Sequence, residues 1–266
     1  MTAGEINEIR RAVLEERPLI HAITNPISIN QCANAILAVG ASPIMAEHPS
    51  EVAEICVRSK ALVLNLGNIT DVRMESMQIA AEAAAQYGIP CVTDAVGVAC
   101  STLRRKFLLG LLEKYPTAII KGNYSEIYAL YDSAYCAEGV DAKSDTGAES
   151  AAEAAKGLAH RYGAVVLASG AEDIVCDGTE QIRVKNGTSR LATVTGTGCM
   201  LGMLCGVYLS VCRNFRAAVT ACAVLGISGE LADVAAGSGS FMAGLLDRLS
   251  DLSDDNVERR LRIEEI

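Results

Sequence analysis

The stretch ALVLNLG at residues 61–67 decides the fold of this chain. It is a continuous apolar run of strand length that ends at a glycine, which is the pattern of a strand buried on both faces. Further short apolar runs alternate with helical segments, at residues 19–23, 43–46, 89–94, 118–121 and 164–168. Repeated strand–helix units of this kind predict an α/β fold, in which a mostly parallel sheet is flanked by helices.

The segments between these runs have helical patterns that end at glycines such as Gly88 and Gly163. We expect helices over residues 25–39, 51–59, 71–87, 103–114, 125–130 and 146–162. The pattern then changes, because an Asp-Gly pair at residues 177–178 predicts a hairpin between residues 174–176 and 181–185.

Apolar helices should follow the hairpin, over residues 197–211, 217–235 and 241–249. The charged tail, residues 253–266, is expected to form a short helix on the surface. No segment rich in Pro, Gly or Ser divides the chain, so we expect a single domain over residues 1–266.

The composition argues against several classes of function. The net charge is −9, half of the residues are hydrophobic, and the chain has no Trp and 3 Phe. An acidic chain repels polyanions, so we expect no nucleic-acid partner and no membrane association. The longest apolar run, Met200 to Cys212, is too short to span a bilayer, and the charged first residues do not resemble a secretory leader. Ten cysteines without a CxxC pair indicate reduced thiols in a cytoplasmic protein.

The sharpest local feature is the turn VTGTGCM at residues 194–200, which opens an apolar helix. Gly196 and Gly198 let the backbone approach a ligand closely, and the free N–H groups of residues 196–199 would point at an anion such as a phosphate. The alternative is an ordinary turn in which Thr195 or Thr197 caps the helix.

Cys199 stands in the first turn of that helix. A thiol at a helix N-terminus has a lowered pKa, so we expect Cys199 to be partly ionised. It could serve as a base, as a nucleophile or as a small packing residue. No histidine is close to it in sequence, so a cysteine-dependent hydrolase is a poor alternative.

Polar residues follow several of the predicted strands, and parallel sheets bind ligands at the carboxyl ends of their strands. Asp94 could hold a cation or a water molecule there, and Lys121 could bind a phosphate. Glu126 is either the capping-box partner of Asn123 or a Mg²⁺ ligand that acts through water. A phosphate-binding turn, a lysine and two acids together indicate phosphoryl transfer, although the Walker A pattern is absent from the sequence.

Several longer segments carry a resemblance to a known family. They are ITNPISIN (23–30), NAILAVGASPIMA (34–46), ALVLNLGNIT (61–70), KGNYSEI (121–127) and VTGTGCMLG (194–202). The chain resembles the hydroxyethylthiazole kinase family of the ribokinase-like superfamily. The resemblance implies a three-layer sandwich and transfer of the ATP γ-phosphate to 4-methyl-5-(2-hydroxyethyl)thiazole in thiamine salvage. It also implies Mg²⁺ as cofactor and a homotrimer with the thiazole site near the subunit contacts.

The resemblance also assigns roles to individual residues. Met45, Gly196 and Asn25 would bind the thiazole, whereas Lys121 and Ser169 would bind ATP. The acidic positions around the metal would be Asp94 and Glu126, and the catalytic turn would consist of Thr197, Gly198 and Cys199.

The chain departs from the family pattern in places. Residues 94–101 read DAVGVACS where the family usually has DPVGAGAT, Lys121 replaces a more frequent arginine, and Ser169 replaces a frequent threonine. We therefore expect altered nucleotide contacts. The alternatives are a related kinase that acts on a hydroxymethylpyrimidine or pyridoxal, and a non-catalytic thiazole-binding homologue.

Overall fold

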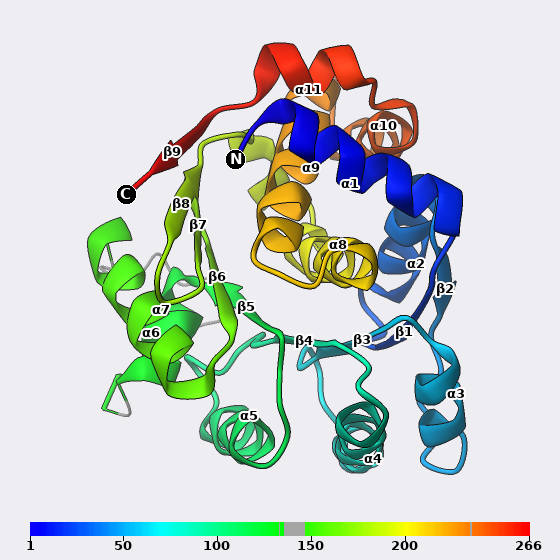
Figure 1. Ribbon diagram of the computed structural model, residues 1–266, viewed down its shortest axis with the longest axis vertical. Coiled ribbons are helices and arrows are strands. Elements are labelled where there is room, and N and C mark those ends of the chain that lie inside the picture. The colour runs from blue at the N-terminus through cyan, green and yellow to red at the C-terminus, as the bar shows by residue number, and fades with distance from the viewer. Residues whose placement is uncertain (133, 136–146, 235) are drawn as a thin grey trace.

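The computed structural model describes residues 1–132, 134–135, 147–234 and 236–266. Its strands form one sheet that crosses the middle of the molecule, and helices pack on both faces of this sheet (Figure 1). The sequence prediction of an α/β fold with a mostly parallel, helix-flanked sheet is confirmed.

The sheet has nine strands in the order β2-β1-β3-β4-β5-β6-β7-β8-β9. Their bounds are β1 (Leu19–Ile23), β2 (Ser42–Ile44), β3 (Ala61–Asn65), β4 (Cys91–Asp94), β5 (Ile119–Asn123), β6 (Val165–Ser169), β7 (Asp173–Cys176), β8 (Gln181–Val184) and β9 (Ile263–Glu265). The strands from β2 to β6 in this order are parallel, and the last three pairings are antiparallel. The strand order reverses at β1, which lies between β2 and β3, and parallel sheets bind ligands beside such a switch point.

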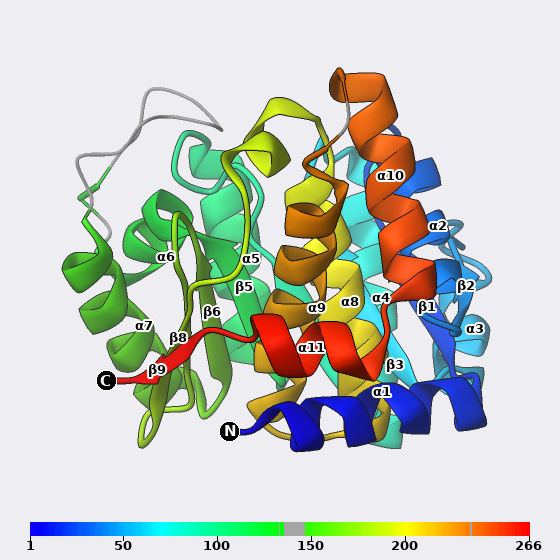
Figure 2. The same cartoon turned by 90° about the horizontal axis from the view of Figure 1, so that it is seen from above.

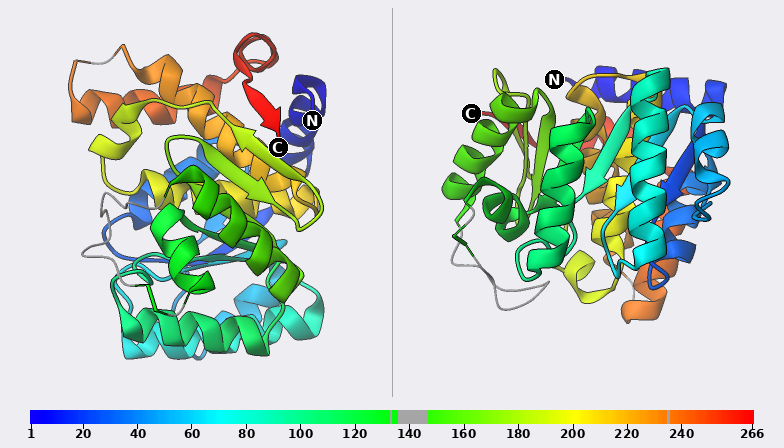
Figure 3. Two further views of the ribbon diagram at one scale, coloured as in Figure 1. Left: turned by 90° about the vertical axis from the view of Figure 1, so that its left-hand side faces the viewer. Right: turned by 90° about the horizontal axis from the view of Figure 1, so that it is seen from below.

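The helices form two layers that Figures 1 and 2 show from two directions. One layer holds α3 (Val52–Arg58), α4 (Asp71–Tyr87), α5 (Thr102–Lys114), α6 (Tyr124–Tyr131) and α7 (Ala148–Tyr162). The other holds α1 (Ala3–Glu16), α2 (Ile29–Ala38), α8 (Thr197–Val211), α9 (Arg216–Ala232), α10 (Ser238–Asp251) and α11 (Asp254–Arg260). The view from below in Figure 3 shows the first layer in front of the sheet.

Strand β3 shows why the sheet needs both layers. Its side chains alternate between the two hydrophobic cores: Val63 belongs to the core under α8 and α9, whereas Leu62 and Leu64 belong to the core under α4 and α5. All five residues of β3 are buried. The run ALVLNLG is therefore a strand covered on both faces, as its composition predicts.

Helix α8 packs closely on β3 through a glycine. A Cβ atom at Gly206 would overlap the side chain of Val63, so only glycine allows this approach. Residues 200–210 of α8 are all buried, and α9 is buried inside the same layer. Helix α9 carries few charged residues because most of it is buried within the chain itself. None of the helices in the described ranges combines the length and the apolar character of a bilayer span.

The element predictions hold for most of the chain, two of them need correction, and one begins outside the described residues. The helix expected from residue 25 begins at Ile29, because the Asn25 side chain accepts hydrogen bonds from the N–H groups of Ile27 and Ser28 and forms a turn there. The charged tail contains the expected helix α11 but ends in strand β9, which pairs with β8. Helix α7 begins at Ala148, and the predicted start at Thr146 lies outside the described residues.

We predict opposite effects for alanine at two helical glycines. Gly206→Ala should destabilise the fold by about 1–2 kcal/mol, because the added methyl group overpacks the contact between α8 and Val63. Gly110→Ala in α5, where a Cβ would meet nothing within 4 Å, should stabilise it by about 0.5–1 kcal/mol through helix propensity. Urea unfolding midpoints measure both changes. Equal shifts in the same direction would contradict the tight packing of α8 on β3.

Candidate functional site

The predicted site residues lie in a row along one edge of the sheet. Parallel strands bring their carboxyl ends together, and the strand order sets the sequence of residues along that edge. Going from β2 to β6, these residues are Met45, Asn25, Asn65, Asp94, Lys121 and Ser169. The glycine turn before α8 meets the middle of this row.

The centre of the row is a buried ion pair. Lys121 Nζ lies 2.9 Å from Asp94 Oδ1, and both side chains are almost fully inaccessible to solvent. Asn65 Nδ2 donates to the other carboxylate oxygen, Asp94 Oδ2, at 2.7 Å. Burial disfavours the charge on Lys121, but the carboxylates of Asp94 and Glu126 outweigh it and raise the pKa of the ammonium group, so Lys121 remains a cation.

A chain of side-chain amides connects this ion pair to the thiol. Asn25 Nδ2 lies 3.0 Å from Asn65 Oδ1 and 3.5 Å from Cys199 Sγ. Asn65 Oδ1 also accepts from the N–H group of Gly67 at 3.0 Å. Cys199 and Asp94 are thus linked through Asn25 and Asn65. The carboxyl-end rule selects residues 65–68 from the sequence, and so includes Asn65, but the sequence gives Asn65 no role in the site.

The glycine turn has the geometry of an anion site. Gly196 is the residue before the first turn of α8, with φ +91°, and the first intrahelical bond runs from Met200 N to Gly196 O. The N–H groups of residues 197–199 precede that bond and point out of the helix end. A Cβ at Gly198 would lie 3.5 Å from Lys121 Nζ, so the ammonium group stands beside this helix end.

The alternative of a threonine cap is wrong for this turn. No side chain caps α8, and the Thr197 hydroxyl donates to Leu191 O at 2.8 Å instead. Thr197 therefore contributes its backbone to the helix end, while its side chain fixes the preceding short helix (Ser189–Thr193).

The expected low pKa of Cys199 is also wrong. Burial raises the pKa of this half-buried thiol, and the nearby Asp94 carboxylate raises it further. Lys121 and the hydrogen bonds to the sulfur act in the opposite direction but do not compensate. Cys199 is therefore a neutral thiol at neutral pH, despite its position in the first turn of a helix.

Glu126 makes both contacts that a capping box requires. Asn123 Oδ1 accepts from Glu126 N, and Glu126 Oε2 accepts from Asn123 N at 2.7 Å. Glu126 Oε1 additionally accepts from Gly97 N at 2.7 Å, so it also holds the loop that departs from the family pattern. Burial raises the pKa of Glu126 to about 7, although Lys121 and the two N–H groups oppose this.

The carboxylates fit a metal that is held mainly by water and phosphate. No group of three or more His, Cys, Asp or Glu side chains among the described residues could enclose a metal ion alone. Asp94 and Glu126 sense each other's charge, and Lys121 is the cation beside both of them. When both acids are ionised they outnumber the one lysine, so a further cation would be stabilised beside them, and Mg²⁺ commonly binds through one or two carboxylates, waters and phosphates.

The two remaining predicted residues lie at opposite ends of the row. Ser169, at the end of β6, donates a hydrogen bond from Oγ to Gly122 O at 3.3 Å. Met45, just after β2, is partly buried and packs against the same core as α8. These two residues make their contacts apart from the network of Asn25, Asn65, Asp94, Lys121 and Cys199.

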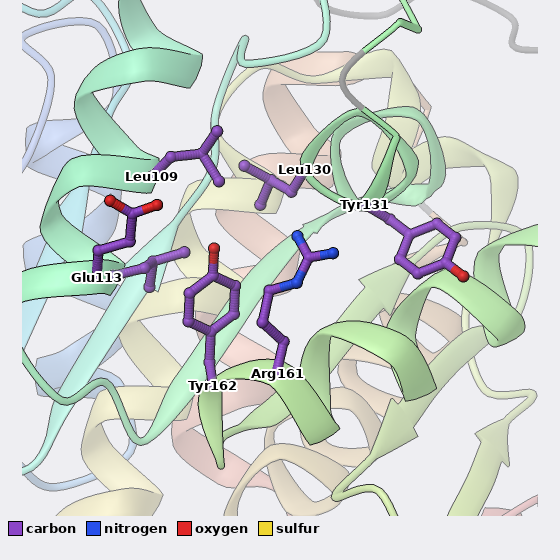
Figure 4. Close-up of a pocket in the computed structure, with 7 residues that line it drawn as sticks. Leu109, Glu113, Leu130, Tyr131, Arg161 and Tyr162 are labelled. Carbon is purple, nitrogen blue, oxygen red and sulfur yellow. The ribbon is translucent and has the colours of Figure 1, made fainter.

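A large surface cavity lies away from this site. It has a volume of about 670 Å³ and is formed by α5, α6 and α7, with Leu109, Glu113, Leu130, Tyr131, Arg161 and Tyr162 in its wall (Figure 4). Helix α5 leads into the amino end of β5, and helix α7 leads into the amino end of β6. The row of site residues lies at the opposite, carboxyl ends of the strands. The cavity therefore does not belong to the site.

Comparison with known proteins identifies the family to which the chain is similar. Residues 10–255 match the sequence model of the hydroxyethylthiazole kinase family. Hydroxyethylthiazole kinase 2 of Clostridium botulinum is 44% identical over 261 residues, which cover 96% of this chain and 98% of that protein.

Solved structures agree with the sequence match. A hydroxyethylthiazole kinase protein from Pyrococcus horikoshii aligns with a TM-score of 0.91 at 34% identity and covers 99% of both chains. A ribokinase-like superfamily protein from Enterococcus faecalis aligns with a TM-score of 0.63 at 11% identity, over 89% of this chain and 87% of that one, which shows the fold alone. The ribokinase-like architecture that the resemblance implies is confirmed.

We predict that Cys199 reacts slowly with iodoacetamide at neutral pH. A raised pKa leaves less thiolate at any given pH, and the thiolate is the reactive form. The pH midpoint of alkylation, followed on the Cys199 peptide by mass spectrometry, should be higher in the folded protein than in the urea-unfolded chain. Asp94→Asn should lower the folded midpoint, because it removes a charge that raises it. A midpoint that is lower in the folded protein than in the unfolded chain would contradict the raised pKa and show that the helix N-terminus lowers the pKa of Cys199.

Proposed function

The chain belongs to the hydroxyethylthiazole kinase family, and on this premise we propose that it transfers the γ-phosphoryl group of ATP to the hydroxyl of 4-methyl-5-(2-hydroxyethyl)thiazole in thiamine salvage. The observation that carries the proposal is the order of residues along the sheet edge. Strand order puts Met45 and Asn25 on one side of the Asp94–Lys121 pair and Ser169 on the other. Two substrates that meet at one phosphoryl group need such a linear site.

Each part of the row then has a role in binding. Met45, Asn25 and the backbone at Gly196 bind the thiazole alcohol on the β2 and β1 side. Ser169 and Lys121 bind ATP from the β6 and β5 side. The γ-phosphate lies between the two substrates, at the N–H groups that begin α8 and beside the ammonium group of Lys121. That ammonium group is close to the helix end, because a Cβ at Gly198 would lie 3.5 Å from Lys121 Nζ.

The chemistry of the step is charge stabilisation and alignment. The alcohol oxygen bonds to the γ-phosphorus while the bond from that phosphorus to the ADP oxygen breaks and ADP leaves with its electron pair. The hydroxyl proton passes to an oxygen of the transferred phosphoryl group and from there to water. The N–H groups of residues 197–199 and Lys121 stabilise the charge on the transferred group. A loose transition state needs little help from a base. A neutral Cys199 thiol therefore acts by orienting the hydroxyl, and the raised pKa of Cys199 supports this role over proton acceptance.

We propose Mg²⁺ as the metal and Asp94 and Glu126 as the residues that hold it through water. The ion, when bound, neutralises the phosphate charge and orients the polyphosphate. Asp94 is oriented by Asn65 and Lys121, and Glu126 by two backbone N–H groups, so both carboxylates are fixed before any cation arrives.

We also propose that the enzyme acts in the cytoplasm as a homotrimer of single-domain subunits. The family resemblance supports the trimer, and so do two exposed apolar side chains, Ile27 two residues after Asn25 and Leu37 near the C-terminal end of α2. Ile27 is 62% and Leu37 is 55% exposed, and a subunit contact there would remove both from water. The free cysteines of the described residues suit a reducing compartment.

The proposed reaction is tested by ADP release. Purified protein with Mg²⁺-ATP should release ADP only when the thiazole alcohol is present, because the alcohol completes the linear site. Pyridoxal and hydroxymethylpyrimidine serve as alternative acceptors in the same coupled assay. Faster turnover of either one than of the thiazole alcohol would replace the proposed substrate, and binding of the thiazole by calorimetry without ADP release would identify a non-catalytic homologue.

Gly198→Ala should lower kcat/KM by at least about tenfold, because the added methyl group stands where the transferred phosphoryl group meets the helix end. The variant should fold normally, since the new Cβ would contact only Lys121 Nζ at the ordinary distance of 3.5 Å. Cys199→Ala serves as the comparison and should cost less, because a neutral thiol contributes only orientation. Wild-type activity in Gly198→Ala would refute the anion site at this turn.

A further inference from the structure

The loop that carries Met45 is held in place by residues that sequence analysis did not select. Met45 follows β2, and the next two residues, Ala46 and Glu47, are bonded to β1 and α4. A methionine has a flexible side chain. Its position in a binding site therefore depends on how firmly the surrounding backbone is fixed.

His21 holds the loop from β1. Its Nε2 lies 2.9 Å from Ala46 O, and because a carbonyl oxygen only accepts, this nitrogen carries the proton. Burial lowers the pKa of His21, so the ring is neutral and has a single N–H group to donate. Nδ1 has no hydrogen-bond partner in the part of the chain that the structure describes. The one proton of this buried ring is therefore used to hold the loop.

Two residues of α4 hold the loop from the other side. Ser76, fully buried, donates from Oγ to Glu47 O at 2.7 Å. Arg73 binds the Glu47 carboxylate with two nitrogens, Nε to Oε2 at 2.7 Å and Nη2 to Oε1 at 3.4 Å. The Arg73 side chain is only 12% exposed, although Glu47 is 45% exposed, so the guanidinium end of this pair is better shielded from water than that of an ordinary surface ion pair.

Arg73 also connects the loop to the centre of the site. Its Nη1 donates to Asn68 O at 2.9 Å, at the end of the segment after β3. Asn68 has φ +48°, a left-handed conformation that needs support from its surroundings. The adjacent Gly67 donates its N–H to Asn65, which orients Asp94. One guanidinium thus joins the Met45 loop to the segment that leads to Asn65.

We propose that Arg73, Ser76 and His21 are positioning residues for the alcohol substrate: they fix the backbone next to Met45 and so set the affinity of the site for the thiazole alcohol without touching it. This inference rests on the proposed function. In this inference the affinity for the alcohol depends on contacts between Glu47 and α4, which lie outside the row of site residues.

The test combines kinetics with amide hydrogen exchange. Arg73→Ala should raise KM for the thiazole alcohol by about fivefold to tenfold, with kcat and KM for ATP changed by less than about twofold. Exchange of the peptide that contains residues 45–48 should become faster. Glu47→Ala should have the same sign and a smaller effect, because Arg73 keeps its bond to Asn68 O. Arg73→Lys should recover part of the affinity through its remaining charge.

Matched variants distinguish the possible failures. Arg58→Ala removes an arginine from a solvent-exposed ion pair with Glu54, on α3, and should leave KM and exchange of the 45–48 peptide unchanged. The double variant of Arg73 and Glu47 to alanine should be no worse than Arg73→Ala alone. An unchanged KM in Arg73→Ala, in an enzyme that turns over the thiazole alcohol, overturns the inference. An equal loss in KM for ATP also overturns it, since that indicates a general effect on the fold.

A wild-type enzyme that does not turn over the thiazole alcohol would overturn the proposed function, and the substrate role of these residues with it. Faster exchange of residues 45–48 in Arg73→Ala would still show that Arg73 holds the backbone next to Met45. The two failures are therefore seen in different measurements.

Discussion

The buried pair of Lys121 and Asp94 is the constraint on which the site depends. Both side chains are almost completely removed from water, and an ion in such a place costs several kcal/mol unless it is paired and hydrogen-bonded. The surroundings must therefore fit the pair closely. A Cβ at Gly202 would lie 3.0 Å from Asp94 Oδ2, and one at Gly198 would lie 3.5 Å from Lys121 Nζ. Only the contact at Gly202 is tighter than ordinary packing, so Gly202 lets α8 pass close over the pair, whereas a Cβ at Gly198 would make an ordinary contact.

Burial, together with the Asp94 carboxylate of this pair, explains the neutral thiol of Cys199. A helix N-terminus stabilises an anion by about 0.3–1 kcal/mol at an ordinary exposed position. Burial of a titratable group opposes its ionisation by on the order of 4 kcal/mol in strong cases, and Asp94 adds like-charge repulsion at Cys199. The helix effect is the smaller of the two. The position of Cys199 in the first turn therefore does not make it a thiolate, and its role in the proposed reaction is to hold a hydroxyl group in place.

Local sequence patterns account for much of this structure and fail where long-range contacts decide. Residues 61–65, 71–87 and 197–211 form the elements that their composition predicts, because burial on both faces, glycine stops and apolar helix periodicity are local signals. Strand β9 was missed, since its three residues are largely exposed to solvent and pair only because β8 offers a free edge.

Candidate site residues could be selected from the sequence because parallel strands place their last residues at one edge of the sheet. The side-chain contacts that each of these residues makes could not be predicted. Asn25 was read as the first residue of a helix, whereas its side chain bridges Asn65 and Cys199. Asn65 is forty positions further along the chain, and its contact with Asp94 depends on the pairing of β3 with β4. The pKa of Cys199 depends on burial and on Asp94, and neither is visible in the residues next to it.

The charge balance of the site bears on how it would receive a nucleotide. Asp94 and Glu126 contribute two negative charges when ionised, and Lys121 contributes one positive charge that Asp94 already engages. The chain as a whole is also acidic, with a net charge of −9. A triphosphate therefore meets repulsion from this edge unless positive charge is added. The N–H groups at the start of α8 supply a partial charge of about +0.5 at most. That is less than the negative charge of a triphosphate requires, so the proposed divalent cation follows from the electrostatics of the site as well as from the family resemblance.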